Sequence, residues 1–540
     1  MSLNGSQKAA QLESRRRWLQ AAVASAATLW LPRSAWSQPR WPANPFTLGV
    51  ASGAATPSSV LLWTRLHLPG VAAASLGPAP VTVRWELADD EGFRRILHSG
   101  QALAPPELAH SVHQEVPGLA PERWYFYRFL VGEHVSPVGR TLTLPRPEAQ
   151  VQRLRLAYAS CQKWEDGFFS AWRHLRAEQP DGVVFLGDYI YEYPGRSSRV
   201  RVPTGGWVVS LDDYRQRYAL YKSDPDLQAM HAACPWWVTW DDHEVQNDYA
   251  GTQPGDSGFN DPAPNSNFLN RRAAAYQAWY EHMPVSASVL TQSLAGLASG
   301  AEMRIHQRVQ FGQLAELYLL DARQYKDPQV CTKGGAMGSG IVNPAQCPAW
   351  QDPGRSLLGQ RQEQWLAQEL AQTRSRQTRW QMLGQQSLFG PRDFKPGAGQ
   401  SLWNDGWDGY SAARTRLTAA LQQHQVPNPV LLGGDVHENW VGHVKADYAD
   451  PASASIGVEF CGTSITSRSG GNARTAERLA ENPHFVFADA QRKGYGLLDY
   501  TPAELRTTLR VVDDVTRADA GIDTLARFVV QAGRPVVQTG

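Results

Sequence analysis

The sequence has few cysteines, no excess of either charge and no long hydrophobic run. Five cysteines in 540 residues are too few for a disulfide scaffold, and their odd number leaves at least one thiol unpaired. Lys and Arg total 52 and Asp and Glu total 51, so there is no basic field that would recruit nucleic acid. There is also no internal repeat, which leaves an ordinary globular chain long enough for two or more domains.

The N-terminal segment is typical of an export signal. Residues 14–20 carry a twin-arginine pattern, residues 21–31 are apolar but too short to span a bilayer, and residues 35–37 offer a small-x-small cleavage site. An amphipathic helix is the alternative, but this run has almost no polar face. We therefore expect residues 1–37 to be a twin-arginine signal peptide. The mature chain, without a transmembrane anchor, is expected in the periplasm or secreted, with the twin-arginine machinery as its export partner.

The cysteines fall into three groups. Cys331 and Cys347 bracket a Gly-rich loop and are expected to form a disulfide in an exported protein. Cys234 and Cys461 are either buried apolar cysteines or a second pair. Cys161 directly follows a predicted strand, a position that allows it to act as a metal ligand.

Two regions of different pattern follow the signal segment. Residues 46–145 contain short β-branched and aromatic runs separated by Gly and Pro clusters, which predict a small N-terminal β-sandwich. Over residues 150–515 strands alternate with helices, which indicates an α/β layered catalytic domain, and residues 516–540 are left as a C-terminal tail. The expected strands are 154–158, 183–186, 236–240, 304–309, 314–320, 379–383 and 430–433, and the expected helices are 167–178, 266–282, 359–376 and 411–424. Gly/Pro-rich loops are expected at 195–208, 251–264 and 327–355.

Four segments place metal-type ligands directly after predicted strands. They contain Cys161; Asp188 and Tyr191; Asp242, His243 and Asn247; and Asp435 and His437. Each segment alone has an ordinary explanation, such as an N-capping Asp, a core His or an inert buried Cys. Loops at the carboxyl edge of α/β sheets converge on one crevice, however, so the four together predict a shared metal site.

One group of residues favours a strongly Lewis-acidic metal. Asp188 can bridge two cations through its two oxygens. Tyr191 would bind as phenolate, and because the free phenol has a pKa of about 10, ferric iron suits it better than Zn²⁺ or Mg²⁺. Cys161 would bind as thiolate, and His437 would complete this first coordination shell.

A second group favours a harder metal. Asp242 and Asp435, with Asp188 bridging, offer oxygen ligands that suit Ca²⁺, Mg²⁺ or Mn²⁺. Asn247 is interpreted as an additional ligand or a phosphate contact, with an ordinary polar loop residue as the alternative.

These segments resemble the PhoD-type alkaline phosphatases of the calcineurin-like metallophosphoesterase superfamily. The matching motifs are Cys161, the run 187–192, the run 240–244 and the run 434–437, with 49–53 and 62–65 resembling the family's N-terminal domain. The resemblance runs from about residue 46 to residue 500. It implies a two-sheet α/β/β/α sandwich after a small all-β sandwich domain. It also implies ferric iron in the first site and calcium in the second, with another divalent cation as the alternative there.

Two further residues are expected to act on the substrate. In the superfamily that this chain resembles, the histidine at the place of His243 faces the phosphate and helps the leaving group, and a structural hydrogen bond is the alternative. Arg323 follows an apolar strand and could clamp a phosphate through two N–H groups. A salt bridge to Asp321 or another carboxylate is an equally good interpretation of Arg323.

These residues together predict an exported, metal-dependent phosphoesterase. A hydroxide held between the metals would attack phosphorus in line, so that monoesters and also diesters would be hydrolysed. The chain contains neither a G-x-S-x-G elbow nor a P-loop, so no covalent serine intermediate is needed. The alternatives are a phosphodiesterase or phospholipase-D-like hydrolase, and a non-catalytic exported binding protein that metals stabilise.

Overall fold

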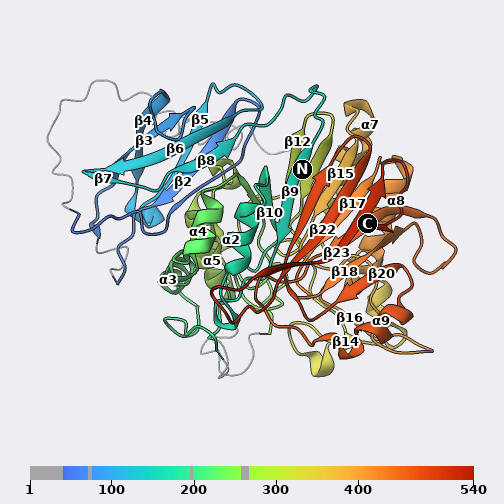
Figure 1. Cartoon of the computed structure of the whole chain (residues 1–540). Coiled ribbons are helices and arrows are strands. Elements are labelled where there is room, and N and C mark those ends of the chain that lie inside the picture. The colour runs from blue at the N-terminus through green and yellow to red at the C-terminus, as the bar shows by residue number, and fades with distance from the viewer. Residues whose placement is uncertain (1–40, 71–75, 195–198, 257–266) are drawn as a thin grey trace, which may run out of the picture.

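The computed structural model describes residues 41–70, 76–194, 199–256 and 267–540 (Figure 1). The predicted signal peptide at 1–37 lies outside the described residues, as do parts of the predicted loops 195–208 and 251–264. In the part of the chain that is described, no helix combines the length and the apolar character that crossing a membrane requires.

The N-terminal region is built of strands. One sheet has the order β4 (Ile96–Ala104), β3 (Val81–Ala88), β6 (Trp124–Val131) and β7 (His134–Val135), and β8 (Gly139–Leu142) pairs with β6. Every second residue of β6 is buried, from Tyr125 to Val131, as expected for a strand with one face on a core. The strands β1 (Val50–Gly53), β2 (Ser59–Arg65) and β5 (Ser111–Pro117) belong to a different sheet, which also contains catalytic-region strands.

That larger sheet has ten strands. Its order is β24-β23-β22-β21-β9-β10-β11-β1-β2-β5, with β9 (Leu154–Ala159), β10 (Gly182–Phe185), β11 (Trp236–Val238), β21 (Lys493–Tyr500), β22 (Glu504–Val512), β23 (Ile522–Gln531) and β24 (Gln538–Thr539). Its centre, β9-β10-β11, is parallel. β1 joins β11 where Gly53 pairs with Trp236, and a Cβ on Gly53 would lie 2.3 Å from the Pro284 carbonyl oxygen, so only glycine fits this junction.

The second sheet has seven strands. Its order is β12 (Gln307–Phe311), β13 (Ala315–Leu319), β15 (Trp380–Gly384), β17 (Pro429–Gly433), β19 (Ser455–Cys461), β18 (Asn439–Lys445) and β20 (Phe485–Asp489). β13, β15 and β17 are almost entirely apolar and fully buried, as is typical of parallel strands covered on both faces. A short pair, β14 (Ile341–Val342) with β16 (Leu402–Trp403), lies outside both sheets.

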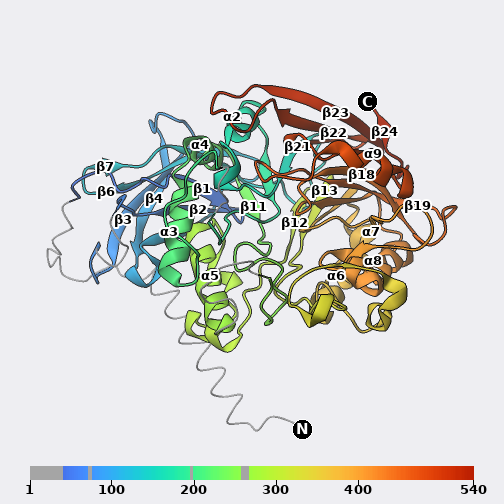
Figure 2. The same ribbon diagram turned by 90° about the horizontal axis from the view of Figure 1, so that it is seen from below.

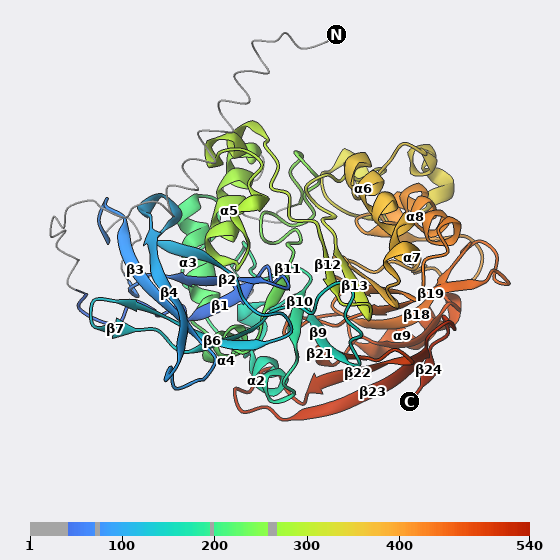
Figure 3. The same ribbon diagram turned by 90° about the horizontal axis from the view of Figure 1, so that it is seen from above.

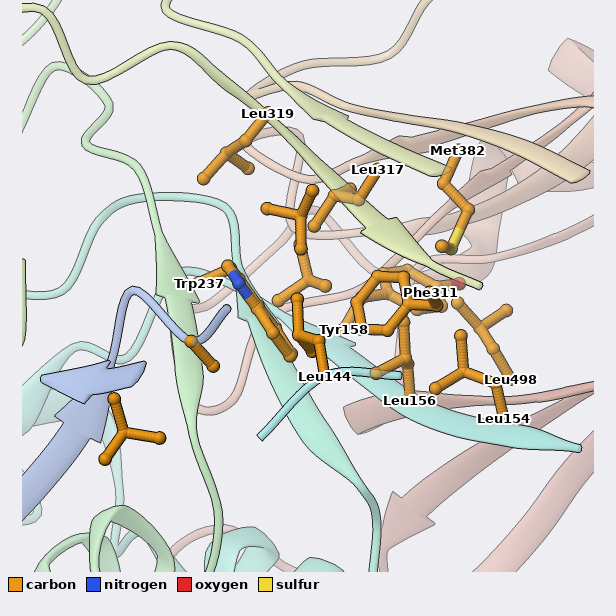
Figure 4. Close-up of a cluster of buried hydrophobic side chains, with 14 of the residues drawn as sticks. Leu144, Leu154, Leu156, Tyr158, Trp237, Phe311, Leu317, Leu319, Met382 and Leu498 are labelled. Carbon is orange, nitrogen blue, oxygen red and sulfur yellow. The ribbon is translucent and has the colours of Figure 1, made fainter. Parts of the chain in front are cut away.

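The two large sheets pack face to face around one hydrophobic core. Leu156 and Tyr158 of β9 lie in the same buried cluster as Leu317 of β13 and Met382 of β15 (Figure 4). At about 25 cal/mol per Å² of apolar area removed from water, such burial supplies most of the driving force for folding. The packing also brings the carboxyl ends of β9, β10, β11 and β17 into one region.

Helices cover the outer faces of both sheets (Figures 2 and 3). Those packed in one core cluster with β9, β10 and β11 are α2 (Ser170–Ala177), α3 (Leu211–Lys222), α4 (Pro225–His231) and α5 (Phe268–His282). Those packed on β13, β15 and β17 are α6 (Gln360–Ala371) and α8 (Ser411–Gln423), with α7 (Thr373–Arg376) after α6 and α9 (Thr475–Glu481) beside β20. The predicted α/β/β/α sandwich, with an all-β region before it, is therefore confirmed.

The end of the chain differs from the expected tail. Residues 522–531 form β23, which pairs along its length with β22, and β24 adds to its other side. Leu525 and Phe528 pack on or within the main core, so the segment 516–540 contributes two strands to the ten-stranded sheet. The strand was not predicted because the charged and small residues at 513–521, directly before it, are typical of a loop.

The predicted disulfide between Cys331 and Cys347 is present, whereas Cys161, Cys234 and Cys461 are free and buried. Replacing Cys331 and Cys347 together with serine is expected to lower the free energy of unfolding by about 3 kcal/mol, because a closed loop of this length restricts the unfolded chain. Chemical denaturation without reductant measures the change. Adding reductant should destabilise the wild type but not the double variant, and equal midpoints for both proteins would contradict the expectation.

Candidate metal centre

The ligand types predicted from the sequence converge at the carboxyl ends of the strands. Three groups each bring their ligand atoms within 4.8 Å of one another: Cys161, Asp188 and His437; Asp188, Asp242 and His243; and Asp241, Asp242 and Asp435. Asp188 is common to the first two groups and Asp242 to the last two. The groups therefore form one continuous cluster rather than separate sites, which fits a centre that holds more than one cation.

The backbone is strained where it presents these side chains. The φ angles are +60° at Cys161, +57° at Asp188, +66° at Asp435 and +58° at His437, a region that residues other than glycine rarely adopt. Each of these residues lies just beyond the end of its strand, β9, β10 or β17. Strain of this kind persists only where the surrounding structure imposes it, and it gathers at functional sites.

Tyr191 reaches into the first group of ligands. Its hydroxyl donates to Asp188 Oδ2 at 2.8 Å and lies 3.2 Å from His437 Nε2 and 2.7 Å from Ser467 Oγ. Burial, and then the charge of Asp188, raise the pKa of the Tyr191 phenol well above its usual value, and the same two causes raise the pKa of the Cys161 thiol. Two anionic ligands here would therefore need a strongly Lewis-acidic cation.

The buried carboxylates also have unsatisfied oxygens. Among the described residues, no hydrogen-bond donor reaches Asp188 Oδ1, Asp241 Oδ2 or Asp435 Oδ2. Burial raises the pKa of Asp241 and of Asp435 well above the usual range; Arg323 opposes the rise, and the neighbouring carboxylates add to it. Buried carboxylate oxygens without a hydrogen-bond donor are costly unless cations neutralise them, so this donor set fits bound metal ions.

Arg323 is buried among the carboxylates. Its Nε contacts Asp241, its Nη1 donates to Asp405 Oδ2 at 2.7 Å, and its Nη2 lies 3.7 Å from Asp242. These ion pairs agree with the salt-bridge interpretation. Asp321 is not a partner of the Arg323 guanidinium, because its carboxylate accepts the backbone N–H of Arg323 at 3.0 Å instead. A phosphate clamp at Arg323 stays a prediction.

His243 is held by Glu192. Its Nδ1 donates to Glu192 Oε2 at 2.7 Å, and its ring lies against Tyr191 with centroids 4.2 Å apart. Burial alone would lower the pKa of the imidazole, but the opposite effect of Glu192 and the other nearby carboxylates is larger. The pKa of His243 is therefore well above its usual value. Glu192 Oε1 accepts the backbone N–H of Asn247 at 2.8 Å, which places Asn247 beside the cluster; its side chain as a ligand stays a prediction.

Several residues of the site were missed in the sequence. Asp241 stands next to Asp242 in the chain, and two adjacent carboxylates after a strand could have drawn attention to it. Glu192 lies in the run that contains Asp188 and Tyr191. Ser467 lies in a loop far away in the chain, so no local pattern marked it. Its hydroxyl donates to the Cys161 carbonyl oxygen at 2.8 Å.

Glu244 fixes two of the ligand loops to each other. Its carboxylate accepts the backbone N–H groups of Asp188 at 3.1 Å, Tyr189 at 2.6 Å and Asp241 at 2.8 Å. Replacing Glu244 with glutamine is expected to lower the free energy of unfolding by about 2 kcal/mol and to reduce bound metal, because a buried N–H loses its acceptor. Denaturation midpoints and metal content measure this. Glu477→Gln, at an exposed position of α9, is the control, and equal effects of the two changes would contradict the assigned role.

Comparison with known proteins gives consistent matches along the chain. The family model "PhoD-like phosphatase" matches residues 156–509, and "PhoD-like phosphatase, N-terminal domain" matches residues 32–145. Alkaline phosphatase D of Bacillus subtilis (strain 168) is 42% identical over 503 residues, covering 91% of this chain and 82% of that protein. A solved structure described as "Structure of PhoD" has a TM-score of 0.84 and 41% identity, and the match covers 93% of each chain.

Proposed function

The chain belongs to the PhoD-like phosphatase family, and we propose that this phosphoric ester hydrolase works outside the inner membrane. We further propose that its metal centre contains ferric iron and calcium. The main support is the continuous cluster around Asp188, in which three carboxylates each have a buried oxygen that no donor reaches from the described residues. A binding protein with a closed structural metal would not need His243 at its edge.

The ligands divide by their chemistry. Cys161, Tyr191 and His437, with Asp188 bridging, would hold ferric iron, since phenolate and thiolate favour a strong Lewis acid. Asp242 and Asp435 would hold calcium, or another divalent cation, with Asn247 as an additional ligand. The unpartnered Oδ2 of Asp241 makes this residue a further ligand of the second site.

The protein's own side chains would do the remaining chemistry. When bound, the cations would lower the pKa of a coordinated water and neutralise the phosphate oxygens. His243, kept protonated by Glu192, would give its proton from Nε2 to the departing alkoxide. Arg323 would hold Asp241 and Asp242 in place, and a clamp on the phosphate would require it to release one of them.

The direct test is release of inorganic phosphate by the purified protein. Hydrolysis of p-nitrophenyl phosphate that stops on removal of metal and returns on adding iron and calcium supports the proposal. Comparison with bis-p-nitrophenyl phosphate separates a monoesterase from a diesterase of the phospholipase-D-like kind. Activity that survives complete metal removal would refute the metal-dependent mechanism.

Export by the twin-arginine route is a separate part of the proposal. It is supported by the pattern at residues 14–37 and by the disulfide between Cys331 and Cys347, since such bonds persist in oxidising compartments. Changing Arg15 and Arg16 together to lysine should retain the protein in the cytoplasm, as cell fractionation would show. Unchanged export of that variant would exclude this route.

A further inference from the structure

A group of aromatic side chains extends from His243 away from the metal cluster. The ring of Tyr193 meets that of His243 nearly edge-on, with centroids 5.2 Å apart and planes at 74°. Trp207 continues the row, with its centroid 6.0 Å from that of Tyr193. His243 thus connects the carboxylates on one side to two aromatic rings on the other.

This row is held by a buried cation. Arg217 of α3 is 2% exposed, and its Nη1 donates to the carbonyl oxygens of Tyr191 and, at 3.3 Å, of Tyr193. Its Nη2 donates at 2.7 Å to the carbonyl oxygen of Gly206, the residue before Trp207. One guanidinium therefore fastens both aromatic segments to the same helix, so that their relative position is fixed before a ligand binds.

The two rings differ in how much of them is already covered. The Lys163 ammonium lies 4.5 Å from the centroid of Tyr193, over its ring. Trp207 is half-buried, and within the described part of the chain it has no ring contact besides Tyr193 and no hydrogen-bond partner for its indole N–H. A large apolar ring left partly open beside a reaction site is a surface on which a flat group can stack.

We infer that Trp207, supported by Tyr193, forms a subsite for the alcohol part of the substrate and selects esters whose alcohol carries a ring. This inference rests on the proposed function, in which His243 gives its proton to the departing alcohol. In that step the bond between phosphorus and the alcohol oxygen breaks, water supplies hydroxide to phosphorus and the alcohol leaves with a proton. The alcohol must then lie next to His243, which is where Tyr193 and Trp207 begin.

The test compares benzyl phosphate with butyl phosphate, two esters of primary alcohols of which only one has a ring. Wild type is expected to have the higher kcat/KM for the benzyl ester. Trp207→Ala should lower kcat/KM for benzyl phosphate about five- to tenfold, mainly through KM, and leave butyl phosphate nearly unchanged. Trp207→Phe should restore most of the preference, because it retains a ring.

Trp365→Ala, which removes a half-buried tryptophan that packs outside the site against His306, is the matched control and should leave the preference intact. Thermal midpoints of all variants show whether they are folded. An equal loss for both esters in Trp207→Ala, or no loss for either, would overturn the subsite. A wild type that releases phosphate from no ester at all would instead refute the proposed function, and the inference with it.

Discussion

Replacing Asp188 with asparagine is expected to lower kcat/KM for phosphate esters by about 10³-fold and to reduce the metal content of the protein. Asp188 is 1% exposed and belongs to two of the three ligand groups. Its Oδ2 accepts the Tyr191 hydroxyl at 2.8 Å, and its Oδ1 has no partner among the described residues. An amide in its place would replace one of the two carboxylate oxygens with an N–H₂ group, so the side chain would hold cations more weakly.

The control for this change is Asp212→Asn on α3. Asp212 is exposed, and its ion pair within the described residues is the one with Arg215 at 3.6 Å, so its replacement should leave both activity and metal content unchanged. Inductively coupled plasma analysis and phosphate release are measured on the same preparations. Full activity and normal metal content in Asp188→Asn would show that the cluster is not the reaction centre.

Replacing His243 with alanine is expected to lower kcat by about 10²- to 10⁴-fold on esters with poor leaving groups, because the departing alkoxide loses its proton donor. The loss should be much smaller with p-nitrophenyl phosphate, whose leaving group needs little protonation. Glu192→Gln should give a weaker effect of the same kind, about 10- to 100-fold, since the buried ion pair with His243 Nδ1 at 2.7 Å would be lost.

The dependence on the leaving group distinguishes this role from a structural one. If His243 only supported the fold, its loss would slow the hydrolysis of good and poor leaving groups by the same factor, and the thermal midpoint would fall in parallel. For a series of substituted phenyl phosphates, the logarithm of kcat is plotted against the pKa of the leaving phenol, once for wild type and once for His243→Ala, and the two slopes are compared. Identical slopes would contradict proton donation by His243.

Much of the fold was accessible from the sequence because its central strands are apolar runs and its helices are periodic. The helices expected at 411–424 and 359–376 correspond to α8 and to α6 with α7, and the strand expected at 430–433 corresponds to β17. What local pattern could not show is pairing over long distances. The insertion of β1 beside β11 depends on such a contact, because Gly53 pairs with Trp236, a residue far away in the chain.

The site likewise contains residues that local sequence predicts and residues that it does not. Cys161, Asp188, Asp242 and His437 were predicted because each follows a strand, and the edge of a sheet brings such residues together. Ser467 could not be predicted, since its contact with Tyr191 depends on how a loop more than two hundred residues away folds back. The partners of Arg323 were left open because sequence does not reveal which carboxylate lies across a buried space.

The most direct test of the account is the metal content and the visible absorption spectrum of protein exported by its native route. We expect iron and calcium bound to each chain and a visible charge-transfer band from Tyr191 bound to ferric iron. The band should disappear in Tyr191→Phe but persist in Tyr193→Phe. A colourless protein that contains no iron and is nevertheless fully active would contradict the assignment.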